Sequence, residues 1–505
     1  MRRLRGEFAV LICGMLLAAT CAWGQTAPAP ASGAGAGGNA QSGSTSGNGS
    51  GGSGTVSGGS GTAFVTTQGG DFSGSVPSQA VPGVLRVSLQ DAIDRGLKQN
   101  LGVLISNTDI GTARGQRWEQ LSALLPHVNV TPYADVSEVN LAEFGFTFHF
   151  PGVNIPTIVG PFSYLDMRAN FSQSIFNWNA ITNTRAAQQR VKSAEYTYKD
   201  ARDVVVLGVG NSYLQAIADE ALIDSVDAQV KTAQALFDQA SDQVKAGTSP
   251  AIDALRANVE LQTRQQQLIQ AKNDFAIQKL SLARIIGLAP GQQFELTDKA
   301  LYQPFEGLTV DEALKRAYAS RSDFQAAAAN VRAAEYSRKA ATAEHYPSFS
   351  FTGDYGGAGQ HFSTLQGVFD VRGTLTIPIF AGGAIRGDVQ QTEAQLQESR
   401  DRLENVRAQI DADVRVALLN LDSASQQVAV AQSNIDLAEQ SLTQSRDRFA
   451  AGVTDTVEVV QAQEAAATAH QNYISSLYSF NYAKISLARA MGTAEASVKE
   501  YFKGK

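Results

Sequence analysis

The chain contains one structural unit twice. Pro126 separates a helical stretch from alternating residues, and Pro347 does the same 221 residues later. A period this long is too large for a solenoid repeat. The sequence therefore predicts a tandem duplication, with repeat 1 over 86–307 and repeat 2 over 308–498. Three further landmarks return in the same order, at offsets of 204 or 205 residues: Asp166-Met167-Arg168 as Asp370-Val371-Arg372, Gly247 as Gly452, and Ser281-Leu282-Ala283-Arg284 as Ser486-Leu487-Ala488-Arg489.

The first residues predict export from the cytoplasm. A basic start precedes an apolar run over 8–19, and small residues before Gln25 suit cleavage, so 1–24 is predicted to be a signal peptide. A buried helix is disfavoured by the basic start, and a lipoprotein signal is disfavoured by the residues that precede Cys21. Since Cys13 also lies in this segment, the mature chain is predicted to contain no thiol and no disulfide.

Composition excludes several classes of function. Residues 25–85 are rich in Gly and Ser with Asp71 as the only charge, which predicts a disordered tether. The net charge of −7 becomes about −9 without the signal peptide, and an acidic chain without a basic patch predicts no nucleic-acid partner. The five histidines never pair at metal-ligand spacing on a helix, so no metal site or cofactor is expected. The chain also has no nucleophile elbow or phosphate loop on a suitable element, so it is predicted not to be an enzyme.

Each repeat reads as helix, strand, loop, strand, very long helix, turn and helix. The long helices, of some 66 residues, would each span roughly 100 Å. A tail over 499–505 follows the second repeat. The predicted bounds in repeat 1 are a helix from Ser88 to Leu125, strands at 127–139 and 163–176, and helices at 181–246 and 250–287; those in repeat 2 are a helix at 309–345, strands at 348–357 and 367–380, and helices at 385–451 and 455–492.

The second long helix carries a seven-residue apolar repeat. Such a seam is typical of coiled-coil packing with a left-handed supercoil. The seam consists of Leu396, Leu403, Ile410, Ala417, Ala424, Ala431 and Ala438, with Val414, Leu421, Val428, Ile435, Leu442, Ser445 and Phe449 at the complementary positions.

The strands predict contact with a membrane. In 369–379 apolar residues alternate with Asp370, Arg372 and threonines, and 165–172 follows the same pattern. Alternation over about ten residues is typical of a transmembrane barrel strand, and also of a half-buried soluble strand. Four strands cannot close a barrel, and open edges find no partner in lipid, so the barrel must be shared between chains. Two chains would give eight strands and a plugged bore, whereas three would give twelve strands and leave water inside.

The order of elements, together with the helical turns Gly247-Thr248-Ser249 and Gly452-Val453-Thr454, resembles the outer membrane efflux protein family, the TolC-like channels. The resemblance covers about 87–498. It implies a mixed α+β membrane protein: a homotrimer with a twelve-strand β-barrel in the outer membrane lipid of a Gram-negative-type cell and an α-helical tunnel in the periplasm. It also implies a passive exit duct for an efflux or type I secretion system, served by a periplasmic adaptor (a membrane fusion protein) and an inner-membrane pump. The long tether and the long loop over 140–161 depart from the family pattern.

The resemblance also suggests functional residues. The glycines suit helix ends in a left-handed conformation, and Ser249 and Thr454 are placed to cap the next helix. The turns are predicted to dock the adaptor through Lys245, Gly247, Thr248, Ser249, Arg448, Gly452, Val453 and Thr454. The predicted periplasmic gate consists of Asp253, Glu458 and Gln461, of which Glu458 takes the place of a family aspartate and Gln461 replaces a second acid. The alternative is a periplasmic coiled-coil adaptor or structural protein without a pore.

Overall fold

The computed structural model describes residues 71–145, 156–299, 302–305 and 307–501. All of them belong to the second of two units, Met1–Val65 and Thr66–Lys505. The predicted signal peptide 1–24 and the predicted tether as far as residue 70 lie outside the described residues, as does the end of the predicted tail from residue 502 onward.

The last part of the predicted tether is held by hydrogen bonds. The Val76 N–H donates to the Gln99 carbonyl at 2.9 Å, and the Ser78 N–H donates to the Gly287 carbonyl at 2.8 Å. Strand β1 (Leu85–Val87) then pairs in parallel with β4 (Phe294–Leu296), a small sheet that the sequence did not predict. The prediction of disorder up to residue 85 is therefore wrong for residues 72–85, since the Phe72 carbonyl also accepts from Nδ2 of Asn100. Composition did not reveal this because the contacts are made by the backbone.

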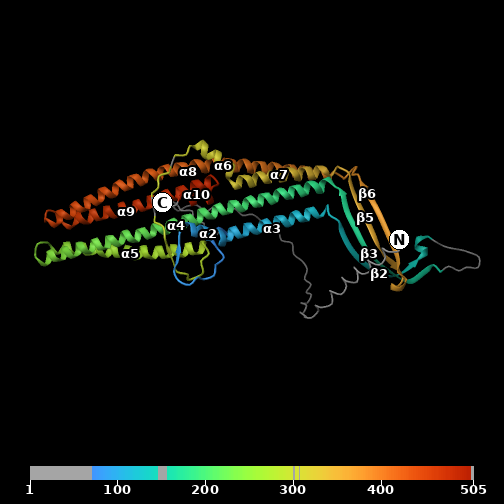
Figure 1. The fold of residues 1–505 in the computed structure, drawn as a ribbon, viewed down its shortest axis with the longest axis horizontal. Coiled ribbons are helices and arrows are strands. Elements are labelled where there is room, and N and C mark those ends of the chain that lie inside the picture. The colour runs from blue at the N-terminus through green and yellow to red at the C-terminus, as the bar shows by residue number, and fades with distance from the viewer. Residues whose placement is uncertain (1–70, 146–155, 300–301, 306, 502–505) are drawn as a thin grey trace, which may run out of the picture. The chain divides into compact units, whose positions relative to one another are not determined.

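The two repeats give the same succession of elements, and Figure 1 shows their arrangement. Repeat 1 comprises α2 (Leu89–Gln99), α3 (Leu101–Ser122), β2 (His127–Asn140), β3 (Ile158–Phe176), α4 (Trp178–Lys245) and α5 (Ala251–Ile285). Repeat 2 comprises α6 (Val310–Ser320), α7 (Ser322–Ala343), β5 (Ser348–Gly359), β6 (Gln366–Thr376), α8 (Ala384–Ala450) and α9 (Thr456–Ala490). Three short helical turns, η1 (Asp71–Ser73), η2 (Leu141–Phe144) and η3 (Phe362–Thr364), and a last helix, α10 (Ala494–Tyr501), complete the described elements.

The first helix of each repeat is broken, contrary to the prediction of one continuous helix over 88–125 and over 309–345. A single extended residue separates the two parts: Asn100 has a ψ of 131° and Arg321 has a ψ of 120°. Buried Asn100 caps α3 by accepting the Gly102 N–H at 2.9 Å and donates to the Phe72 carbonyl at 2.8 Å. The sequence did not reveal the break, because a single extended residue does not disturb the helical spacing of the apolar residues on either side.

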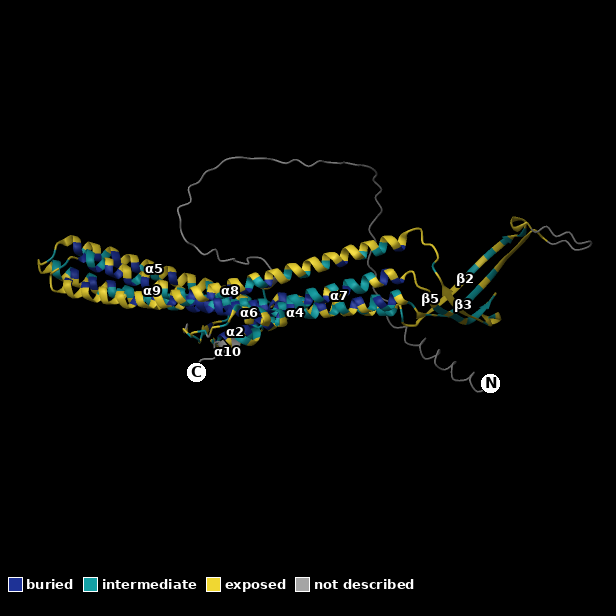
Figure 2. Ribbon diagram, turned by 90° about the horizontal axis from the view of Figure 1, so that it is seen from above, coloured by how far each residue is buried: buried dark blue, intermediate teal, exposed yellow. Residues whose placement is uncertain are grey.

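The long helices pack as the seven-residue repeat predicts. Helices α4 and α8 contain 68 and 67 residues, which corresponds to roughly 100 Å each. Along α8 the predicted seam is buried at Leu396, Ile410, Val414, Ala417, Leu421, Ala424, Val428, Ala431, Ile435, Ser445 and Phe449. These residues face α6, α7 and α9, and Figure 2 shows the buried positions as bands along the helices.

Four antiparallel strands form one sheet in the order β2-β3-β5-β6. Since α3 leads into β2, β3 into α4, α7 into β5 and β6 toward α8, all four helix connections lie at the same end of the sheet. Strand β3 begins at Ile158, earlier than predicted, and β6 ends at Thr376 instead of residue 380. Pro378 explains the early end of β6, because proline has no N–H to donate to a neighbouring strand.

The main apolar core lies where α2, α4, α5 and α9 meet the small sheet. Its centre includes fully buried Tyr213, whose hydroxyl donates to the Val87 carbonyl at 3.0 Å and to Oδ2 of Asp298 at 2.9 Å. Burial raises the pKa of Tyr213, so the phenol stays protonated and can act as a donor. Among the helices of the described chain, none has both the length and the apolar character needed to cross a membrane.

Candidate functional site

The two long helical hairpins end in turns of the same geometry. Gly247 and Gly452 both have a φ of +70°, a conformation that glycine adopts without steric cost. In the first turn the Thr248 N–H donates to the Gln243 carbonyl at 2.9 Å, and in the second the Val453 N–H donates to the Arg448 carbonyl at 2.9 Å. These six-residue closures satisfy the last carbonyls of α4 and α8 and reverse the chain tightly.

The predicted capping roles of Ser249 and Thr454 are wrong. The residue before α5 is Pro250, which makes no side-chain cap, and the cap of α9 is Asp455, whose carboxylate accepts the Glu458 N–H. Ser249 instead donates to Oε1 of Gln243 at 3.1 Å. Each turn is one residue longer than the predicted cap position allows, which moves both hydroxyls outside the helix start.

Glu458 is held by residues of its own hairpin. Its Oε1 lies 2.9 Å from Nη1 of Arg448, at the end of α8, and 3.5 Å from the Ser445 hydroxyl. The Thr454 hydroxyl donates to Oε2. About a third of the Glu458 side chain stays exposed, so the carboxylate is both anchored and accessible to water. The geometry joins two predicted tip residues to the predicted gate residue.

The other two predicted gate residues lie in different surroundings. Asp253 is buried in the first turn of α5, 3.7 Å from Nη1 of Arg256, whereas Gln461 is exposed on α9. An apolar cluster joins the two hairpins close to both turns. It comprises Leu236 and Ala240 of α4, Ala257 of α5, Phe449 of α8 and Val459 of α9. The two tips therefore form one end of the helical region, at the left in Figure 1.

The remaining predicted tip residues are exposed. Lys245 pairs with its neighbour Asp242, at 3.0 Å on the surface of α4. Val453 is an apolar side chain with 69% of its surface exposed at the end of the second hairpin. The geometry of this turn uses the backbone of Val453 and does not require its exposed apolar side chain.

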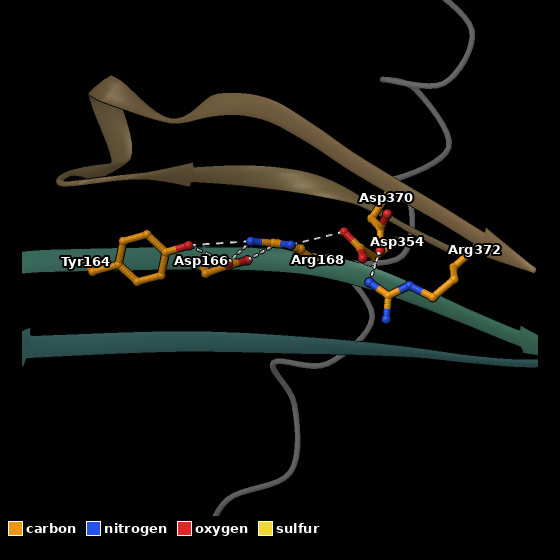
Figure 3. A network of polar contacts seen from close by, with 6 residues as sticks. All are labelled: Tyr164, Asp166, Arg168, Asp354, Asp370 and Arg372. Carbon is orange, nitrogen blue, oxygen red and sulfur yellow. Dashed lines mark hydrogen bonds and ion pairs between the residues drawn. The ribbon is translucent and has the colours of Figure 1, made fainter. Parts of the chain in front are cut away.

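A polar network on the sheet was not predicted as a site. Arg168 of β3 donates to both oxygens of Asp166, at 2.8 and 2.6 Å, and to Oδ2 of Asp354 on β5 at 3.2 Å (Figure 3). On β6, Arg372 donates to Asp370 at 3.0 Å. The duplicated Asp-x-Arg triplet was visible in the sequence as a landmark of the repeat. Its pairing across strands was not, since Asp354 lies 186 residues from Arg168.

Both repeats match a known family. A model of the family described as outer membrane efflux protein matches residues 108–288 and 313–493. The first match covers most of α3 and the second covers most of α6 and all of α7, and each covers both strands and the whole helical hairpin of its repeat.

Known relatives and solved structures match most of the chain. Outer membrane protein OprJ of Pseudomonas aeruginosa is 25% identical over 437 residues, which cover 81% of this chain and 85% of OprJ. Outer membrane protein TolC of Escherichia coli is 22% identical over 345 residues, which cover 64% of this chain and 68% of TolC. The crystal structure of the Campylobacter jejuni CmeC outer membrane channel has a TM-score of 0.69 at 18% identity, covering 82% of this chain and 89% of CmeC. That likeness shows a common fold.

Proposed function

This chain belongs to the outer membrane efflux protein family, and we propose that it is the exit duct of a tripartite efflux system, built as a homotrimer around one continuous lumen. The family, the outer-membrane localisation and the efflux function predicted from the sequence are thereby confirmed. The match of both repeats favours the duct over the alternative of an adaptor or a structural protein without a pore. The observation that supports a trimeric duct most directly is the four-stranded sheet β2-β3-β5-β6.

The sheet has one face suited to lipid. Large apolar side chains lie exposed on it, although polar residues of the same strands face the other way. The exposed residues are Val128, Val130 and Val136 of β2, Met167 and Ile175 of β3, Tyr355 of β5, and Phe369, Val371 and Leu375 of β6. An apolar patch this extensive on one face indicates a contact with membrane or protein. With lipid outside, the face of Arg168 and Asp354 lines the interior.

The edges of the sheet call for further copies of the chain. In the described chain, β2 and β6 each have one strand partner, so each leaves one edge open. Open edges are not tolerated in lipid, since their N–H and C=O groups find no water there. Three copies supply twelve strands, enough for a water-filled bore, and pairing of β6 with β2 of the next copy closes the barrel.

The helices present surfaces that fit the same assembly. Exposed apolar residues follow α5 at Ile252, Leu255, Val259, Ile269, Ile277 and Leu280, and α8 at Val416, Leu419, Val430 and Leu437. Several are spaced by seven residues or a multiple of seven, as in a coiled-coil seam. The seam of α8 that packs within the chain uses other positions of that helix, so this second stripe is free to pack on a neighbouring copy.

We expect neighbouring residues of β6 to differ in their access to water. Thr374→Cys on the polar face should react with a membrane-impermeant maleimide in outer-membrane vesicles, whereas Leu375→Cys on the apolar face should stay protected. The native cysteines lie in the predicted signal peptide, so each variant would carry one reporter thiol. Amine cross-linking of the same fractions should give a species of three times the monomer mass. Equal labelling of the two positions, or a soluble monomer, would refute the trimeric barrel.

The tip of the duct is proposed to be the narrow end and the docking surface for the periplasmic adaptor, with the inner-membrane pump beyond. In a trimer, three copies of Glu458 surround the axis if the α8–α9 hairpins point inward, and a ring of carboxylates favours cations. Arg448 moderates this charge because it lies 2.9 Å from each carboxylate. Glu458 is therefore proposed to tune cation preference together with Arg448.

Glu458→Gln should reduce the cation preference of single channels, measured as the reversal potential across a KCl gradient. Arg448→Gln should increase the preference, because it exposes the carboxylate that the guanidinium compensates. Asp253→Asn tests the other predicted gate carboxylate and should shift the potential less than Glu458→Gln does, since Asp253 is buried beside Arg256. An unchanged reversal potential in both Glu458→Gln and Arg448→Gln would assign the cluster to the geometry of the turn alone.

A further inference from the structure

The polar face of the sheet carries its charges in layers. Strand register places Asp354 opposite both Asn170 and Asp370, so the carboxylates of β5 and β6 lie at one level. Arg372 is opposite Thr352, one level nearer the helices, and Arg168 is opposite Gly356, one level farther from them. Asp166, opposite Ala358, forms the next level. From the helices outward, the levels are therefore cationic (Arg372), anionic (Asp354 beside Asp370), cationic (Arg168) and anionic (Asp166). Figure 3 shows these side chains.

Arg168, Asp166 and Asp354 form the most buried and most closely bonded part of this network. Arg168 bridges two levels and two repeats, because it bonds to Asp166 on its own strand and to Asp354 on β5. The side chains of Asp166 and Asp354 are only 14% and 19% exposed. Gly356 lets β5 lie close to the backbone of β3 at this level: a Cβ there would lie 2.0 Å from the Met167 carbonyl oxygen. By contrast, Arg372 is 68% exposed and Asp370 is 52% exposed, so this pair meets the solvent directly.

The spacing of the layers decides what a passing solute senses. Residues i and i+2 of a strand lie about 7 Å apart along it. The Debye length at physiological ionic strength is about 8 Å, so the fields of adjacent levels overlap in the lumen. Three carboxylates and two guanidiniums then leave one negative charge per chain on this part of the wall. Without the guanidiniums the same wall would carry three.

We propose that these layers form a charge-compensated filter in the barrel, in which Arg168 offsets one of the two negative charges of Asp354 and Asp166 and so lets solutes of either charge pass. The proposal rests on the trimeric duct proposed above, which turns each level into a ring with threefold repetition. It places a second determinant of selectivity in the barrel wall, far along the chain from the tip residue Glu458. The competing explanation is a structural staple, in which the same bonds only hold the two repeats together and do not affect selectivity.

Arg168→Gln and Asp354→Asn break the same ion pair but change the charge in opposite directions. In planar bilayers, we expect trimers of Arg168→Gln to have a cation-to-anion permeability ratio about threefold above that of the wild type, as three unit charges would give across about 10 Å of screened water. Asp354→Asn should lower the ratio by a similar factor. The double variant Arg168→Gln/Asp354→Asn should return it to the wild-type value although the pair stays broken. All shifts should vanish in molar salt, where the Debye length is about 3 Å.

Arg168→Lys is the matched control, because it keeps the charge and loses the two-pronged hydrogen bonding. A filter predicts the wild-type ratio for this variant, whereas a staple predicts lower heat stability of the trimer and the same ratio for every variant. If Arg168→Gln does not assemble, Arg372→Gln on the exposed pair should give the same direction of shift. Single variants that shift the ratio in the same direction, or not at all, would overturn the filter. A wild-type protein that forms no channel would instead contradict the proposed duct.

Discussion

Replacing Val453 by aspartate is expected to abolish transport while leaving the amount of outer-membrane trimer unchanged. Val453 ends the second hairpin with 69% of its surface exposed, so the substitution meets no core of its own chain. If the tips dock the adaptor, an aspartate there puts an unpaired charge into the contact, and a desolvated charge without a partner opposes binding strongly. The measurement is efflux of a pump substrate from intact cells, with trimer yield followed by cross-linking.

Two further variants define what the Val453 result means. Val453→Thr keeps the shape of the side chain and remains uncharged, so transport should largely persist. Lys245→Glu tests the first hairpin, where Lys245 pairs with Asp242 on the surface, and it should also impair transport without lowering trimer yield. Transport that survives both charge-changing variants would show that docking lies elsewhere.

Arg321→Met should destabilise the helical region by about 3 kcal/mol. The Arg321 side chain is 5% exposed at the break between α6 and α7, and it pairs with Asp323 at 2.6 Å and with Asp413 of α8 at 2.8 Å. Removing the guanidinium takes the shared ion-pair partner from both carboxylates. Since Asp413 retains partial access to water, we expect the lower end of the usual range for a broken buried pair. The free energy of unfolding, followed by circular dichroism in urea and detergent, is the measurement.

The stability lost in Arg321→Met should depend on pH. Burial raises the pKa of Asp323, but the hydrogen bond and charge of Arg321, the Phe324 N–H and the charge of Arg489 together outweigh that effect and hold its pKa below the ordinary aspartate value. A lowered pKa contributes stability that is present above the unfolded value of about 3.9 and is lost as the pH falls through the folded value. The difference between wild type and Arg321→Met should therefore narrow on acidification.

Arg415→Met provides the matched control for this measurement. Arg415 pairs with Asp411 at 2.8 Å within α8, but both side chains are exposed, so its loss should change stability little. A destabilisation as large as that of Arg321→Met would show that burial is not the reason for the effect at the helix break.

Sequence alone determined the repeated elements and the family. Periodicity reveals a long helix because a coiled-coil seam buries a residue at every third or fourth position, and the buried positions from Ile410 to Ile435 follow that rule. Glycine at a hairpin end is equally visible, since Gly247 and Gly452 adopt a positive φ that other residues avoid. Alternation in β3 and β6 identified strands with one polar face, which is a local property of the chain.

Tertiary structure decided the partners of single polar groups. Asn100 and Arg321 break their helices through contacts with Phe72 and Asp413, which lie far away in the sequence, so no local pattern marked them. The same holds for Glu458, whose neighbour Arg448 comes from the preceding helix, and for Arg168, which meets Asp354 only when the two repeats pair their strands. Periodic burial is encoded within each segment, whereas hydrogen bonds and ion pairs depend on which segments the fold brings together.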